Sequence, residues 1–124
     1  MIYFNSLECD KPLGMQSGAI KDKQISASSE YNANFGAKYA RLNTVRGGGS
    51  WAAKTKDARQ WLQIDLGNTN FIISRVATQG RATASQWVKK YRLQYSNNGR
   101  RFQYYKAGRR AKVKCIKSTK TVRF

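Results

Sequence analysis

The side chains most often used in catalysis and metal binding are scarce in this chain. Its 124 residues include no histidine, which excludes Ser-His-Asp catalysis, Cys-His catalysis and histidine metal sites. The 6 acidic residues contain no pair at a spacing typical of acid–base catalysis. Cys9 and Cys115 stand far apart and are not spaced as metal ligands. We therefore expect a protein that is not an enzyme and that uses no cofactor.

Charge points instead to binding. Lys and Arg number 24 against 6 Asp and Glu, a net charge of +18, which favours phosphatidylserine membranes, sulfated glycans or sialylated surfaces. Aromatic residues make up 12% of the chain, enough for a core, so a wholly disordered basic protein is excluded. Basic residues among Trp, Tyr and Phe keep nucleic-acid binding as a rival class, although no motif of the common nucleic-acid-binding families is present.

These groups must be positioned by β-strands. Residues 61–66 alternate and place Leu62, Ile64 and Leu66 on one apolar face. Asn97-Asn98-Gly99 predicts a hairpin turn between two strands. The other strand candidates are residues 24–28, 71–77, 91–96 and 101–105, with one helical turn at 36–42 and long loops at 29–60 and 79–87. Short strands separated by turn signals predict an all-β antiparallel sandwich or jelly roll.

Six motifs in this order resemble the discoidin domain, also called the coagulation factor V/VIII type C domain. They are QISASS at 24–29, YNANFGAKYARLN at 31–43, QWLQIDLG at 60–67, VATQGR at 76–81, QWVKKY at 86–91 and YSNNG at 95–99. The resemblance covers residues 9 to about 106. It implies a galactose-binding-like β-sandwich or jelly-roll barrel.

The resemblance divides the chain into an N-terminal extension at 1–8, a partial discoidin-like domain at 9–106 and a basic C-terminal tail at 107–124. Family members continue past the aromatic strand with further strands and a closing cysteine. We therefore expect the barrel to lack its last strands, unless residues 113–116 and 119–124 supply weak replacements. The family's closing cysteine pairs with the one at the position of Cys9. Cys115 stands in a different context, so the partner of Cys9 stays open, with Cys115 as one candidate.

In this family, loops at one end of the barrel bind glycans, anionic phospholipid, collagen or peptide termini. The matching loops here are residues 30–35, 46–57 and 81–86. The candidate ligand-binding residues are Tyr31, Asn32, Asn34, Phe35, Arg46, Lys54, Thr55, Asp57, Arg81, Thr83 and Gln86.

Each of these side chains has both a binding role and a structural alternative. An aromatic ring such as Tyr31 stacks on a sugar while neighbouring amides bond its hydroxyls, and Phe35 suits either a lipid headgroup layer or the barrel end. Arg81 can pair with a carboxylate or phosphate, or remain a surface or loop-capping arginine. The Gly47-Gly48-Gly49 run is not a phosphate-binding loop, because no Gly-Lys-Ser/Thr follows it.

The sequence therefore predicts a non-enzymatic extracellular recognition or adhesion module. Its partners would be a cell-surface glycan, an anionic lipid at the membrane periphery or a matrix protein. The alternatives are a truncated fragment without independent function and non-specific binding of polyanions or nucleic acid. Residues 1–7 are too short and polar for a signal peptide, so the extracellular expectation comes from the resemblance alone. Some relatives hold a structural calcium, but no acidic cluster here indicates one.

Overall fold

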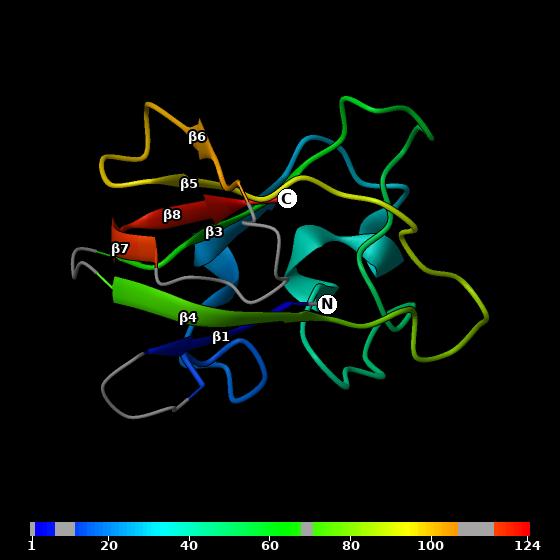
Figure 1. Ribbon diagram of the computed structural model, residues 1–124. Coiled ribbons are helices and arrows are strands. Elements are labelled where there is room, and N and C mark those ends of the chain that lie inside the picture. The colour runs from blue at the N-terminus through cyan, green and yellow to red at the C-terminus, as the bar shows by residue number, and fades with distance from the viewer. Residues whose placement is uncertain (1, 7–11, 68–70, 107–115) are drawn as a thin grey trace.

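A computed structural model describes residues 2–6, 12–67, 71–106 and 116–124 (Figure 1). These residues form eight β-strands that pair in antiparallel fashion in two sheets. The strands are β1 (Ile2–Ser6), β2 (Ile25–Ala27), β3 (Leu62–Asp65), β4 (Phe71–Thr78), β5 (Gln94–Ser96), β6 (Gln103–Tyr104), β7 (Ile116–Thr119) and β8 (Thr121–Arg123). The sheet orders are β1-β4-β7 and β2-β3-β8-β5-β6. The expected all-β antiparallel jelly-roll class is confirmed.

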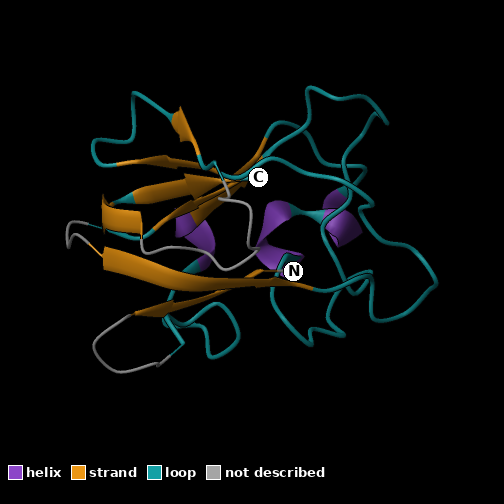
Figure 2. Cartoon of the chain, viewed as in Figure 1, coloured by secondary structure: helices purple, strands orange, loops and turns teal. Residues whose placement is uncertain are grey.

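Three short 3-10 helices complete the described elements: η1 (Asp22–Gln24), η2 (Ala33–Phe35) and η3 (Ala37–Tyr39). The helical turn predicted at 36–42 is η3, closed by bonds from Tyr39 N–H to the Gly36 carbonyl and from Ala40 N–H to the Ala37 carbonyl. The long loops and the helices η2 and η3 gather toward one end of the molecule (Figure 2). The strands lie toward the other end and hold this loop end in place.

The core lies between the two sheets. The alternation predicted for β3 is confirmed, because Leu62, Ile64 and Leu66 are all buried while Asp65 is exposed. Ile64 on β3, Ile73 on β4 and Val122 on β8 belong to one buried cluster and have no solvent exposure. Burial of such aliphatic side chains is the main force that holds the sheets together.

The last residues of the chain supply strands. Residues 107–124 were set apart as a tail, yet β8 lies between β3 and β5, with Val122 opposite Ile64 on one side and Tyr95 on the other. β7 pairs with β4 in the smaller sheet. β8 fits the alternative in which residues 119–124 supply a strand, and the buried Val122 completes the apolar face although cations surround it in the sequence. Residues 107–115 and Cys9 lie outside the described residues, so the cysteine pairing remains a prediction.

Arg123 shows how β8 places a cation on the outer side of the larger sheet. Its guanidinium carbon lies 4.6 Å from the ring centre of Trp61 and 3.9 Å from that of Phe102. Its Nε and Nη2 donate to Gln63 Oε1 at 2.9 and 2.6 Å. Burial lowers the pKa of this guanidinium. Aromatic faces and an amide thus stabilise a charge that composition alone assigns to solvent.

The predicted hairpin is confirmed, since β5 pairs with β6 and Gly99 has a φ of 71°. The strand predicted at 91–96 is shorter than expected. β5 begins at Gln94, because β8 offers a partner only to Gln94–Ser96. Tyr91 therefore lies outside the strand and is exposed, whereas Leu93 is buried. Tyr91 and Leu93 both line a hollow beside β5.

Candidate functional site

Two of the three predicted loops are joined by backbone hydrogen bonds. Tyr31 N–H donates to the Ala52 carbonyl at 2.8 Å, and Ala52 N–H donates to the Phe35 carbonyl at 3.2 Å. Gly48 N–H donates to the Asn34 carbonyl at 2.7 Å. The loops at 30–35 and 46–57 therefore form one ordered surface.

Arg81 ties the third loop to the other two. Its Nε donates to the Gly48 carbonyl at 2.8 Å and to Thr83 Oγ1 at 2.9 Å, and its Nη1 donates to Gln86 Oε1 at 2.9 Å. Its guanidinium carbon lies 4.8 Å from the ring centre of Phe35. These contacts fit the structural alternative for Arg81, that of capping the loop that ends at Asp57, because Gly48 lies in that loop at 46–57.

Glycine is required at the centre of this junction. A Cβ on Gly48 would lie 2.1 Å from the Phe35 ring, and Gly49 has a φ of 77°, a conformation that other residues rarely adopt. The Thr83 hydroxyl donates to the Gly48 carbonyl at 2.9 Å. The glycine run therefore lets the backbone approach Phe35 and Arg81 closely.

Lys54, Thr55 and Asp57 form a separate exposed group at the other side of their loop. Thr55 Oγ1 donates to Asp57 Oδ2 at 2.9 Å, and Gln60 Nε2 donates to Asp57 Oδ1 at 3.0 Å. The bond from Gln60 is the main cause that lowers the pKa of Asp57, followed by the bond from Arg59 N–H. Gln60 Oε1 in turn accepts hydrogen bonds from the hydroxyls of Ser28 and Ser29. Asp57 is therefore part of a hydrogen-bond network that holds the loop in place.

Replacing Gln60 by alanine should raise the pKa of Asp57 toward its ordinary value of 3.8, because the largest lowering cause is removed. In the native protein the folded pKa lies below the unfolded one. The stabilisation from these bonds is therefore present above the unfolded pKa and lost as pH falls through the folded pKa.

A carboxyl-detected NMR titration measures the change in the pKa of Asp57. The pKa of Asp22, lowered mainly by the hydrogen bond from Arg41, serves as the internal control and should not move. An unmoved Asp57 titration would contradict the assignment.

The remaining predicted residues lie on the same loop end. The Asn32 side chain accepts a bond from Asn34 N–H at 2.9 Å and begins η2, and Arg46 is exposed. Tyr31 is 63% exposed, and its ring meets that of Phe35 edge to face at 5.9 Å between centres. The structure thus presents Tyr31 to solvent and uses Asn34, Phe35, Arg81 and Gln86 partly to hold the loops together. Ligand binding by all eleven residues remains a prediction.

Sequence reasoning missed the two most exposed apolar side chains after the third loop. Trp87 is 66% exposed and Val88 is 68% exposed. Lys89 and Lys90 follow them directly and are also exposed. A tryptophan and a valine held in water next to two cations are unusual for a surface with no binding role. The sequence does show the order Trp-Val-Lys-Lys, but this order does not by itself indicate whether the tryptophan and valine are exposed.

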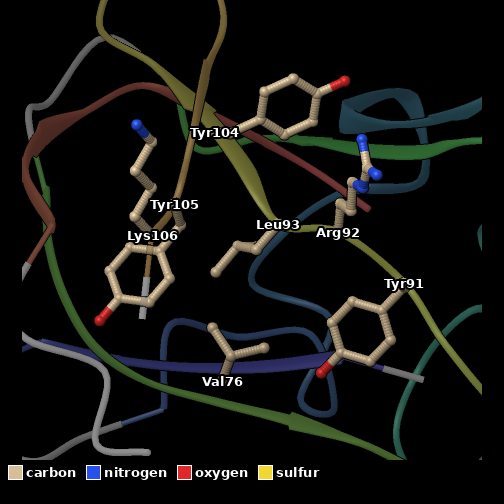
Figure 3. Close-up of a pocket in the computed structure, with 7 residues that line it drawn as sticks. All are labelled: Val76, Tyr91, Arg92, Leu93, Tyr104, Tyr105 and Lys106. Carbon is tan, nitrogen blue, oxygen red and sulfur yellow. The ribbon is translucent and has the colours of Figure 1, made fainter. Parts of the chain in front are cut away.

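A hollow of about 560 Å³ opens between β4 and the β5–β6 hairpin (Figure 3). Its lining residues are Val76, Tyr91, Arg92, Leu93, Tyr104, Tyr105 and Lys106. Figure 3 shows Val76 and Leu93 pointing toward each other across it, whereas Tyr104 and Arg92 lie at its outer rim. The hollow is mostly apolar and lies away from the predicted loops. It offers room for an apolar group but brings no catalytic set together.

Across the part of the chain that the structure describes, no group of three His, Cys, Asp or Glu side chains could hold a metal ion. In those same residues, no helix has the length and apolar character needed to cross a membrane.

Comparison with known proteins identifies the family. The F5/8 type C domain model matches residues 24–124 and so includes β7 and β8. Retinoschisin of Takifugu rubripes is 41% identical over 102 residues, which is 77% of this chain and 36% of that protein. The retinoschisins of Mus musculus and Homo sapiens are 39% and 38% identical over 113 residues, 82% of this chain and 50% of each relative. The chain thus spans about half the length of the two mammalian relatives and about a third of the length of the fish relative. It belongs to the F5/8 type C, or discoidin, domain family.

Proposed function

We propose that this chain is an extracellular recognition and adhesion module whose loop end binds an anionic phospholipid surface. The exposed Trp87-Val88 pair, followed by Lys89 and Lys90, is the observation that carries the proposal. Apolar side chains at a loop tip enter the headgroup layer, while lysines beside them attract anionic lipids. Membership of the discoidin family and similarity to the retinoschisins support a role at the cell surface.

The hydrogen bonds of the loop end favour lipid over sugar as its ligand. Binding of a sugar needs polar groups that are free to meet its hydroxyls. Arg81 and Gln86 bond to each other, and the Asn32 side chain caps η2 by accepting a bond from Asn34 N–H. The exposed apolar groups that follow the third loop are a tryptophan and a valine with lysines beside them, and this combination matches a headgroup layer.

The double change Trp87→Ser and Val88→Ser should lower the affinity for phosphatidylserine-containing vesicles by about tenfold or more, since each buried apolar side chain contributes on the order of 1.5–3 kcal/mol. Vesicle co-sedimentation measures this, with phosphatidylcholine vesicles as the neutral comparison. Tyr104→Ser is the matched control, because Tyr104 is 54% exposed but lies on β6.

Equal binding of the double variant and the native chain would overturn the role of the tip. Equal binding to neutral and anionic vesicles would overturn the preference for anionic lipid. Capture by a neutral sugar resin, lost on Tyr31→Ala but kept in the double variant, would favour the carbohydrate alternative.

A further inference from the structure

A second groove lies between the segments 16–22 and 41–46, and of its lining residues only Arg46 is among the predicted ligand-binding residues. Its volume is about 580 Å³, within the range of natural small-ligand sites. Residues of both segments line it, including Ser17, Lys21, Asp22, Arg41, Asn43 and Arg46. It therefore combines cations with hydroxyl and amide groups.

Arg41 is the fixed cation at the base of this groove. Its Nη1 donates to the Met15 carbonyl at 2.9 Å, and its Nη2 donates to Asp22 Oδ1 at 2.6 Å. The Arg41 side chain is 14% exposed, while that of Asp22 is 65% exposed. The ion pair therefore holds Arg41 in one geometry and leaves the carboxylate at the surface.

Positive charge exceeds negative charge around Asp22. The hydrogen bond from Arg41 is the main cause that lowers the pKa of Asp22, and the charges of Lys38 and Arg46 lower it further. Lys21 is exposed on the same rim. Four cations thus surround one carboxylate, and an incoming anion meets a positive potential.

The groove also presents hydrogen-bond donors suited to a saccharide. Thr44 Oγ1 accepts a bond from Arg46 N–H at 3.3 Å, so its own hydrogen remains to donate. Asn43 has a φ of 56°, and its N–H donates to Gln79 Oε1 at 3.0 Å, which holds its exposed amide at the rim. Asp22 adds a carboxylate that can accept a bond from a sugar hydroxyl.

We propose that this groove binds a sulfated saccharide, with sulfate groups on Lys21 and Arg46 and sugar hydroxyls on Thr44, Asn43 and Asp22. A sulfated sugar carries both oxyanions, which need cations, and hydroxyls, which need a donor or acceptor. A phosphatidylserine headgroup offers no free hydroxyl to the Asp22 carboxylate. The site is separate from Trp87 and Val88, so it stands whether or not the loop tip binds membranes.

The test measures binding of a short heparin oligosaccharide by titration calorimetry. The variant Lys21→Gln with Arg46→Gln should lose about tenfold in affinity, since two charge-assisted contacts are removed. The control Arg100→Gln with Arg101→Gln makes the same change in net charge on the exposed β5–β6 turn, and should lose less than about twofold. Urea unfolding of both variants verifies that the fold is retained.

Four further outcomes decide the chemistry. Equal losses in the two variants would overturn the proposal in favour of general attraction of polyanions to a chain of net charge +18. Equal binding of chemically desulfated heparin would overturn the role of sulfate. If binding to phosphoinositide vesicles depended on Lys21 and Arg46 but binding to heparin did not, the groove would be assigned to a lipid phosphate. Unchanged heparin binding by the Trp87→Ser and Val88→Ser variant would separate this site from the loop tip and support the proposal.

Discussion

Replacing Val122 by aspartate should abolish the cooperative unfolding transition of the domain. Val122 has no solvent exposure and lies at the middle of the five-stranded sheet, opposite Ile64 and Tyr95. A carboxylate there would be buried among apolar side chains without a partner, which costs several kcal/mol or more. Native domains have only about 5–15 kcal/mol of stability in total. Urea unfolding followed by tryptophan fluorescence measures the result.

Val45→Asp is the matched control for this experiment. The same substitution is made at a valine that is 73% exposed, so the free energy of unfolding should change by less than about 0.5 kcal/mol. A Val122→Asp protein with the native unfolding midpoint would mean that β8 does not complete the sheet in solution. It would then favour the division in which residues 107–124 form a tail outside the domain.

Replacing Arg81 by lysine should lower the free energy of unfolding by about 1–3 kcal/mol and loosen the third loop. The guanidinium bonds the Gly48 carbonyl and Gln86 at once while lying against Phe35. A lysine keeps the charge but lacks the planar fork, so the half-buried Gly48 carbonyl and the Gln86 amide cannot both keep their charged donor. Urea unfolding gives the loss, and amide hydrogen exchange at Gly48 and Ala82 locates it.

Arg100→Lys provides the comparison, because Arg100 is an exposed arginine on the β5–β6 turn. It should leave both measurements unchanged. If Arg81→Lys behaved in the same way, Arg81 would be a surface residue free for a ligand rather than the link between the loops.

The strands that the sequence predicts well are those whose pattern is local. Leu62, Ile64 and Leu66 alternate with polar residues, and this alternation alone determines which face is buried. The β5–β6 hairpin was predictable for the same reason, since Asn97-Asn98-Gly99 joins strands that are neighbours in the chain. The loops carrying the candidate site followed from the resemblance, and the structure brings them together through Gly48.

The position of β8 was not predictable from local pattern. Thr121-Val122-Arg123 follows a run of basic residues and has one apolar side chain, so its composition resembles a solvated segment. Its role comes from partners far away in sequence, Ile64 and Tyr95. The exposure of Trp87 was hidden for a related reason, because tryptophan is usually buried and only the packed structure shows which ring is left outside.

The central place of β8 also dictates when this domain can be completed during synthesis. A ribosome makes β3 and β5 well before β8, yet these two strands have no pairing with each other and meet only through it. The β5–β6 hairpin can close early from local contacts, whereas the five-stranded sheet must wait for residues 121–123. Until then the strand edges of β3 and β5 remain open to pairing with other chains. The nascent chain therefore needs protection from aggregation until its last described strand has emerged.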